Sequence, residues 1–343
     1  MLHKLRIATA AALVLSCTLI APSSMAETTL RLSSWLPPGH PIVRDMIIPW
    51  TEQVAEATQG RVKVNVLPKP LGKPPAHFDL AKDGVADVTF GVHGYQPGRF
   101  LLTKAVEMPF LGDSAESTSV AYWRVYKQYM EKANEHDGVT LLSVFTHGPG
   151  HIFNSKRAVN ALEDLNGLKI RVGGGVVNDI AQAIGATALL KPASQAYELM
   201  SNGVADGVFF PSESVASFKL TKLVHYGTLV PKGLYNTSFF LVMNSKTFGE
   251  LPKADQDAIM KVSGENFARL SGKAWDNVDQ IGIARMKEDG VTLSTASDAL
   301  VGQIKKATAG VEQGWVSEAN AKGADGAAIM SALRAEIAKI EGK

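Results

Sequence analysis

The chain has almost no cysteine, and this shortage excludes several kinds of site. Cys17 is the only cysteine among the 343 residues, and it lies close to the amino terminus. A single cysteine can form no internal disulfide bond. A chain that loses its amino-terminal segment would also have no thiolate to bind a metal or to attack a substrate. We therefore expect packing alone to stabilise the mature protein.

An excess of one charge is missing as well. The chain has 35 basic and 33 acidic residues, and no apolar run after the amino-terminal segment is long enough to cross a membrane. A nearly neutral surface releases few counterions from nucleic acid, and the sequence has no basic stripe or helix-turn-helix pattern. The composition therefore favours neither a nucleic-acid-binding protein nor an integral membrane protein.

The amino-terminal segment has the pattern of a signal peptide. Lys4 and Arg6 precede an apolar run over residues 7–20, and small residues at 24–26 provide a cleavage site. We predict a signal peptide of about residues 1–26 and an exported mature chain, in which basic and acidic residues are equal in number. Acylation of Cys17 in a lipoprotein signal is the alternative, and mass spectrometry of the mature amino terminus distinguishes the two.

Strands and helices alternate along the mature chain in the way that builds parallel sheets covered by helices. Helical spacing of apolar residues predicts helices over 43–54, 120–130 and 176–184. Because the chain exceeds the usual size of one hydrophobic core, we expect an α/β fold with two domains. Apolar runs predict strands at 30–32, 62–66, 88–92, 139–145, 168–172, 208–210, 222–229 and 236–244.

Two further segments are expected to join the domains. The glycine and proline cluster His147-Gly148-Pro149-Gly150-His151 is the best candidate for a crossing between them. After Pro252, a helical pattern runs from Ala254 to about Asp289. A helix of roughly 36 residues would extend about 54 Å, which is enough to run across both domains. More than one crossing of this kind would form a hinge.

The stretch Leu165–Gly175 places one arginine beside a glycine turn. Leu168, Ile170 and Val172 predict a buried strand, and a helix is expected to follow the turn. Arg171 therefore lies near a strand end, close to a helix start whose free N–H groups also favour an anion. The planar guanidinium group matches a carboxylate with two hydrogen bonds. The pattern indicates a carboxylate site, and a solvated strand-end arginine is the alternative.

Several ordered motifs together carry a family resemblance. They are Gly84-Val85-Ala86-Asp87-Val88, Met108-Pro109-Phe110-Leu111, the stretch around Arg171, the run from Tyr197 to Phe210, and the segment from Asn244 through Leu251-Pro252 before the long helix. With these motifs, essentially the whole mature chain resembles the solute-binding proteins of TRAP transporters, the DctP-like family.

The resemblance implies a two-lobed periplasmic binding protein fold with discontinuous lobes, a hinge and a long spanning helix. Lobe I would comprise residues 27–150 plus about 238–278, and lobe II residues 151–237 plus about 279–343. The implied function is that of a periplasmic receptor, not an enzyme, which captures a small organic acid anion and delivers it to the subunits of a TRAP membrane permease. In the family, the arginine that matches Arg171 typically binds the substrate carboxylate. We expect a monomer with no cofactor.

The sequence departs from the sialic-acid-binding members of that family at three positions. Their second arginine falls at Gly150, the asparagine after their Asp-Gly motif falls at Phe210, and an aromatic residue falls at Ala193. The first two changes remove polar groups, and the second adds aromatic area. An apolar pocket with one strong polar anchor suits a monocarboxylate with a hydrophobic or aromatic body, because a polyhydroxylated acid would leave hydroxyl groups unpaired. We therefore favour an aromatic or branched keto or hydroxy acid.

Other candidates for the pocket follow from strand ends and side-chain chemistry. Trp35, His93 and Tyr95 follow predicted strands, where open α/β sheets place ligands. Neighbours on a strand point to opposite sides, so Phe210 is expected to face the ligand and Phe209 the core. Histidines could donate to a keto or hydroxyl oxygen, although core or surface roles for these rings are the alternative. The candidate ligand-binding residues are Arg171, Phe210, Trp35, His93, Tyr95, His40, His151 and Asn236.

Metal and enzyme functions are weaker interpretations. His147 and His151 have i, i+4 spacing, but the Gly-Pro-Gly sequence between them prevents the helix that would align them, so we predict no metal site. The Gly173-x-Gly175 sequence lacks the third glycine of a dinucleotide loop, because Asn178 stands there. No nucleophile motif is present. An exported lyase or hydrolase that acts on a small carboxylate in the same cleft remains the alternative to a receptor.

Overall fold

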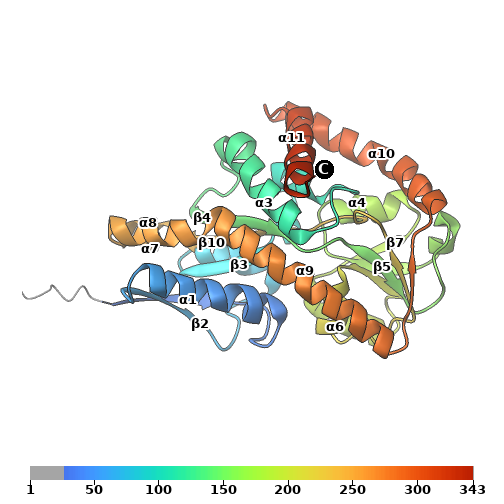
Figure 1. The fold of residues 1–343 in the computed structure, drawn as a ribbon, viewed down its shortest axis with the longest axis horizontal. Coiled ribbons are helices and arrows are strands. Elements are labelled where there is room, and N and C mark those ends of the chain that lie inside the picture. The colour runs from blue at the N-terminus through green and yellow to red at the C-terminus, as the bar shows by residue number, and fades with distance from the viewer. Residues whose placement is uncertain (1–26, 343) are drawn as a thin grey trace, which may run out of the picture.

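The computed structural model describes residues 27–342. The predicted signal peptide and the alternative acylation site at Cys17 therefore lie outside the described residues. Within residues 27–342 the strands form two sheets, one of five strands and one of six. Figure 1 shows them side by side, with helices packed around both.

The first sheet has the strand order β2-β1-β3-β10-β4. The strands β1, β2 and β3 are parallel, whereas β10 runs antiparallel to both of its neighbours. Every residue of β10 is buried, as its largely apolar sequence requires of a strand that lies between two others. The strands are β1 (Thr28–Ser33), β2 (Val62–Val66), β3 (Val88–Val92), β4 (Val139–Thr146) and β10 (Ser238–Asn244).

The second sheet has the order β11-β9-β5-β8-β6-β7. The central strand β8 is parallel to β6 and antiparallel to β5, so a direct hydrogen-bonded ladder joins the strand that bears Arg171 to the strand that bears Phe210. The strands are β5 (His151–Asn154), β6 (Lys169–Val172), β7 (Thr187–Leu190), β8 (Gly207–Phe210), β9 (Tyr226–Leu229) and β11 (Thr292–Thr295).

The two sheets define two lobes, and each is discontinuous in the sequence. We call the β2-β1-β3-β10-β4 sheet with its helices lobe I and the other sheet with its helices lobe II. The chain passes from lobe I to lobe II within residues 147–150, returns within 230–237, and crosses again between β10 and β11. All strands fall on the predicted sides of the lobe boundaries, although the last helix, α11, packs against α3 of lobe I. The boundaries themselves stay a prediction.

Helices cover the outer faces of both sheets (Figure 1). They are α1 (Ile48–Ala57), α2 (His77–Lys82), α3 (Ala115–Val125), α4 (Val176–Ala183), α5 (Ala196–Ser201), α6 (Ser212–Ser217), α7 (Ser245–Glu250), α8 (Lys253–Val262), α9 (Gly264–Glu288), α10 (Asp298–Ala321) and α11 (Gly326–Ile340). Short helical turns include Ile42–Ile47, His93–Tyr95, Leu102–Glu107 and Ala193–Gln195.

The prediction of one helix from Ala254 to about Asp289 is wrong, because the helix breaks at Ser263. The break separates α8 from α9, and Gly264 has a φ of +55°, which disfavours any other residue there. The indole N–H of Trp50 donates to the Ser263 hydroxyl (3.1 Å), and the Ser143 hydroxyl donates to the Gly264 carbonyl (2.8 Å). These contacts from distant segments fix the bend. The remaining 25-residue helix still runs across both lobes.

Helix α9 contacts the start of one helix in each lobe. A Cβ atom at Gly272 would lie 2.4 Å from the Cα of Glu116 in α3, and one at Gly282 would lie 2.4 Å from the Ser212 carbonyl oxygen at the start of α6. These approaches require glycine on α9. Asp276 then accepts hydrogen bonds at the start of α3, and Asp279 accepts one from the Glu213 N–H in α6 (2.7 Å). One helix thus holds both lobes.

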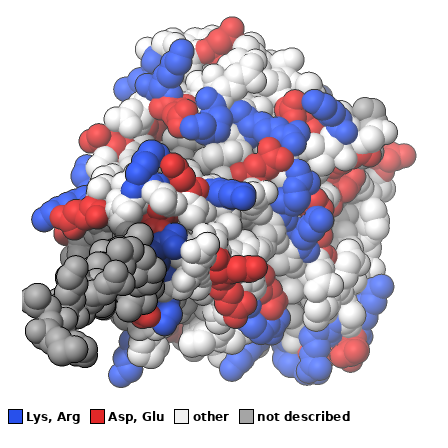
Figure 2. Space-filling view, turned by 60° about the vertical axis from the view of Figure 1, so that its left-hand side comes forward, with Lys and Arg blue, Asp and Glu red and all other residues white. Residues whose placement is uncertain are grey.

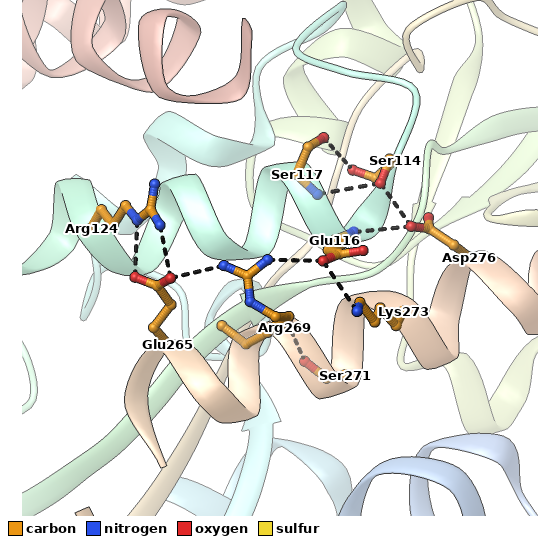
Figure 3. Close-up of polar contacts among 10 residues, drawn as sticks. Ser114, Glu116, Ser117, Arg124, Glu265, Arg269, Ser271, Lys273 and Asp276 are labelled. Carbon is orange, nitrogen blue, oxygen red and sulfur yellow. Dashed lines mark hydrogen bonds and ion pairs between the residues drawn. The ribbon is translucent and has the colours of Figure 1, made fainter. Parts of the chain in front are cut away.

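Polar contacts along α3 and α9 reinforce this attachment (Figure 3). Glu265 of α9 pairs with Arg124 of α3 at 2.8 Å, and Arg269 of α9 pairs with Glu116 of α3 at 2.9 Å. These ion pairs are about one-third exposed, so each contributes little alone. Asp276 is the more buried anchor. It accepts from the Ser114 hydroxyl and from two backbone N–H groups of α3.

Replacement of Asp276 by alanine is expected to lower the free energy of unfolding by about 2 kcal/mol. The change leaves backbone N–H groups at the start of α3 without an acceptor, and losing a helix cap costs about 1–2 kcal/mol. Glu288→Ala on the same helix is the control, because Glu288 is exposed and makes only a 3.5 Å surface pair. Urea unfolding measures both. Equal stability of the two variants would contradict the anchoring role of Asp276.

Candidate functional site

A cavity lies between the lobes, at the ends of strands from both sheets. The wall is largely aromatic and aliphatic. Its residues are Trp35, Ile42, Val92, Tyr95, His147, Arg171, Gly173, Ala193, Phe210, Pro211, Ser214, Phe218, Tyr235, Thr237, Phe239 and Trp275.

Arg171 is the one charged side chain in this wall. It is only 2% exposed, and its Nε–H donates to the Lys191 carbonyl oxygen (2.8 Å), which holds the guanidinium group in place. The group lies over the Phe210 ring, with Cζ 4.5 Å from the ring centroid. Within residues 27–342 it forms no ion pair, and its two terminal nitrogens make no hydrogen bond. A buried cation with unused donors is costly unless an anion joins it.

The predicted division between Phe209 and Phe210 matches their positions. Phe209 is fully buried in the core of lobe II, whereas Phe210 lines the cavity. The Phe210 ring stacks on Phe218, with centroids 5.6 Å apart and planes 9° apart. One face of the cavity is therefore a pair of stacked rings. Such a surface suits a flat apolar body better than a polyhydroxylated chain.

The ring of Tyr235 occupies the space beside Gly150. A Cβ atom at Gly150 would lie 2.1 Å from Tyr235 Cε1. The backbone at this point is also fixed, because the Gly150 N–H donates to the Tyr235 carbonyl and the Leu234 N–H donates to the Gly150 carbonyl, both at 2.9 Å. No arginine side chain could stand at residue 150 with the ring in this place. An aromatic wall therefore takes the space in which the resemblance to sialic-acid-binding proteins would have put a second cation.

The lobes touch each other beside the cavity. Gly174 follows β6 in lobe II, and Gly94 follows β3 in lobe I. A Cβ atom at Gly174 would lie only 2.5 Å from the Gly94 carbonyl oxygen. The Ala193 N–H of lobe II donates to the Tyr95 hydroxyl of lobe I (2.9 Å). Both contacts join loops at strand ends across the cleft, so this arrangement holds the cleft closed.

The expectation that the start of the helix after Arg171 would attract the ligand is corrected by Glu107. The Val176 N–H at the start of α4 donates to Glu107 Oε2 (2.9 Å), and the Ser238 N–H of β10 donates to Oε1 (3.0 Å). This internal carboxylate already takes the helix start and bridges the lobes. Burial raises the pKa of Glu107 to about 7, against the lowering effect of these hydrogen bonds.

Glu107→Gln is expected to change how stability depends on pH. The folded-state pKa of Glu107 lies above its ordinary value of 4.5, so the folded protein binds more protons between pH 4.5 and 7 and loses stability as pH rises through that range. Glutamine cannot ionise, so the variant should gain on the order of 2 kcal/mol relative to the wild type across it.

Urea unfolding at several pH values measures this difference. Buried histidines with lowered pKa values, such as His136 and His147, give the opposite slope, but they do so in both proteins and cancel in the comparison. Parallel stability curves for the two proteins would show that folding does not raise the pKa of Glu107.

Of the other predicted site residues, Trp35 and Tyr95 line the cavity, whereas His93 and His151 do not. His93 lies behind it in lobe I, where Nδ1 is 2.7 Å from the Ser238 hydroxyl and Nε2 is 2.8 Å from His136 Nε2. His151 accepts a hydrogen bond from the Val230 N–H at Nδ1 (3.0 Å). Hydrogen bonds to the protein thus occupy both ring nitrogens of His93 and Nδ1 of His151.

His40 and Asn236 also lie outside the cavity wall. The Nε2 atom of His40 is 3.8 Å from Glu213 Oε1 across the cleft, and neither atom has a hydrogen-bond partner within residues 27–342. Burial lowers the pKa of His40 to about 4. Asn236 is buried between two cavity residues, and its side-chain nitrogen also lacks a partner in this part of the chain.

Sequence reasoning missed several residues of the wall. As a site residue His147 is considered only as a metal ligand, and Tyr235, Phe239 and Trp275 are not predicted to bind the ligand, although all four line the cavity. Tyr235 stands beside the predicted site residue Asn236, and an aromatic residue at the start of a predicted strand is the signal that could have drawn attention to it. Trp275 has no such signal, because a tryptophan within a helical pattern is usually predicted to lie in the hydrophobic core.

The described residues provide no evident metal centre and no membrane span. Within residues 27–342, no group of three or more His, Cys, Asp or Glu side chains could hold a metal ion. None of the helices in this same range has the length and apolar character needed to cross a membrane.

Two discontinuous α/β lobes that close over a cavity with a buried arginine define a solute-binding protein of the two-lobed type. Comparison of the sequence with known families agrees. Residues 32–316 match the DctP family, described as bacterial extracellular solute-binding protein, family 7. The chain belongs to this family, whose members are receptors rather than enzymes. The alternative of an exported lyase or hydrolase is thereby wrong.

Individual relatives extend this result. A TRAP periplasmic solute-binding protein from Bordetella bronchiseptica, solved with bound (R)- and (S)-mandelate, is 46% identical, with a TM-score of 0.89 over 91% of this chain and 99% of its own. A TRAP solute-binding protein from Rhodoferax ferrireducens with copurified benzoate is 28% identical, with a TM-score of 0.86 over 91% and 98%. The outer membrane transporter protein TsaT of Comamonas testosteroni is 30% identical over 92% and 94%.

Proposed function

We propose that this receptor captures an organic monocarboxylate and delivers it to a TRAP membrane permease. The favoured ligand is an aromatic or hydrophobic keto or hydroxy acid. The observation that carries the proposal is Arg171, a buried guanidinium with two unused terminal nitrogens in the wall of an otherwise apolar cavity. A carboxylate would receive two hydrogen bonds from it, and the aromatic wall would cover the rest of the molecule.

The relatives support an aromatic ligand. The two solved relatives described above, from Bordetella bronchiseptica and Rhodoferax ferrireducens, contain mandelate and benzoate, both of which are monocarboxylates with a phenyl ring. The stacked pair Phe210 and Phe218 offers a comparable ring surface here, and the Tyr235 ring takes the place of a second cation. A dicarboxylate would leave one charge without a partner in this cavity, and that would cost several kcal/mol.

The proposed mechanism is closure of the lobes over the ligand. The Gly94–Gly174 and Tyr95–Ala193 contacts belong to the closed arrangement, and in an open form both would separate. We propose that the ligand carboxylate docks on Arg171 first and that closure then excludes water. The permease would recognise the closed form.

A periplasmic location, a monomeric state and the absence of nucleic-acid binding complete the proposal. Acidic and basic side chains are interspersed on the face shown in Figure 2, which fits the balanced charge of the mature chain. A mixed surface of this kind is a poor ligand for a polyanion.

A screen of organic acids by thermal shift tests the ligand class. We expect the largest rise in melting temperature with aromatic monocarboxylates, little with sugar acids, and recovery of the unchanged ligand by mass spectrometry. Small-angle scattering should show a more compact molecule at saturation. Stabilisation by polyhydroxylated acids alone, or identical scattering curves with and without a stabilising ligand, would contradict the proposal.

A further inference from the structure

We propose that His147 determines specificity by accepting a hydrogen bond from a hydroxyl group at the 2-position of the ligand. The inference rests on the proposed function and deepens it, because it selects 2-hydroxy acids over the corresponding 2-keto acids and over acids that lack the oxygen.

The first step is the position of the ring. His147 belongs to the crossing from β4 to β5, lines the cavity and is almost fully buried. Three other cavity residues surround it: Tyr235, Trp275 and Phe239, with ring centroids 5.3, 6.0 and 6.2 Å away. The ring is therefore held in the wall by packing and cannot turn freely.

The second step is the tautomer. The Nδ1 atom of His147 lies within hydrogen-bond distance of the Gly148 carbonyl oxygen. A carbonyl oxygen only accepts, so Nδ1 must carry the proton and Nε2 must carry a lone pair. Burial and, to a smaller extent, the nearby charge of Arg171 lower the pKa of His147 to about 4, so the ring is neutral at physiological pH. In this state Nε2 can only accept a hydrogen bond.

The third step is the free space beside Nε2. Within residues 27–342 this atom has no hydrogen-bond partner. It is also not closed off from solvent, whereas Nε1 of Trp35 and Nε1 of Trp275 are. The open space that the His147 ring borders is the cavity. An acceptor therefore faces the ligand there.

The fourth step places the ligand's hydroxyl near its carboxylate. The charge of Arg171 acts on both His147 and Tyr235, which form an edge contact with each other. Tyr235 lines the cavity beside His147, and because burial raises the pKa of its phenol, the hydroxyl keeps a proton that it can donate. Arg171 and Tyr235 are thus donors, and His147 is the acceptor next to them. A 2-hydroxyl donor satisfies His147, whereas a 2-keto oxygen would place a second lone pair against Nε2.

Calorimetry with four acids tests the proposal: 2-hydroxy-2-phenylacetate, 2-oxo-2-phenylacetate, phenylacetate and 3-hydroxyphenylacetate. The wild type should bind the 2-hydroxy acid at least about tenfold more tightly than the 2-keto acid and phenylacetate. In His147→Phe the ratio between these affinities should fall to about one, whatever the change in overall affinity. His225→Phe is the matched control, since His225 is exposed and bonds only to the Ser155 carbonyl.

Each outcome decides a separate question. If the wild type binds none of the four acids, the proposed function fails and this inference fails with it. If all four bind and the 2-hydroxy preference survives in His147→Phe, only the role of His147 is overturned. If His147→Phe loses affinity only for 3-hydroxyphenylacetate, the hydroxyl group that bonds to His147 lies on the aromatic ring of the ligand. That result would overturn the proposal of a 2-hydroxyl group.

Nitrogen NMR of the wild type gives the same test without a variant, should His147→Phe fail to fold. The Nε2 resonance of His147 should have the shift of an unprotonated ring nitrogen, and it should move on addition of the 2-hydroxy acid but not of phenylacetate. A protonated Nε2, or equal movement with both acids, would overturn the proposal.

Discussion

Arg171→Ala is expected to lose about 3–5 kcal/mol of binding free energy for an aromatic monocarboxylate, which is roughly a 100- to 5,000-fold rise in Kd. The loss is large because the carboxylate would be buried among aromatic rings with its principal counter-charge removed. The guanidinium also stacks on Phe210 at 4.5 Å, so part of the packing against that ring is lost as well. Isothermal titration calorimetry measures the change.

Two further variants make this result specific. Arg171→Lys keeps the positive charge but removes the fork and the contact with the Lys191 carbonyl, so we expect an intermediate loss. Arg44→Ala serves as the control, because Arg44 is largely exposed and pairs only with its neighbour Asp45. Unchanged affinity in Arg171→Ala, with the protein folded, would refute the anchoring role.

Gly150→Ala is expected to abolish measurable binding and to cost about 3 kcal/mol of stability, the upper end of the usual range for overpacking. The new methyl group would lie within the Tyr235 ring, 2.1 Å from one ring carbon. Because two backbone hydrogen bonds tie residue 150 to the segment 234–235, the backbone cannot move aside. The ring would have to turn away from its place in the wall and reshape the cavity.

The matched control is a glycine without such a neighbour. Gly302 lies in α10, and a Cβ atom there would meet no atom within 4 Å. Gly302→Ala should raise stability by about 0.5–1 kcal/mol, because alanine favours a helix, and should leave binding intact. Thermal unfolding and calorimetry compare the two variants. If Gly150→Ala bound ligand as tightly as Gly302→Ala, the fixed position of the Tyr235 ring would be wrong.

The parts of the fold that sequence could predict are those with strong local signals. The strands β3 and β10 are both fully buried, and each has a largely apolar sequence that predicts a strand. Arg171 was identifiable because an arginine among buried strand residues stands before a glycine turn. The orientation of Phe209 and Phe210 followed from the alternation of side chains on a strand.

The parts that could not be predicted depend on contacts between distant segments. The break at Ser263 requires hydrogen bonds from Trp50 and Ser143, and a helical pattern alone gives no sign of them. Glu107 fills the start of α4 from a different lobe, so the helix start looked free when only its own sequence was considered. Trp275 reaches the cavity only through the packing of α9, the helix that carries it. Local patterns contain none of this information.

The central claim is that a single arginine binds the acidic group of a small ligand inside a largely aromatic cavity. A crystal structure of the protein with a ligand retained from the expression host tests it most directly. The account predicts a carboxylate whose two oxygens lie within hydrogen-bond distance of the terminal nitrogens of Arg171, with an apolar body against Phe210 and Phe218. A ligand whose charged group lies elsewhere, with Arg171 unoccupied, would contradict it.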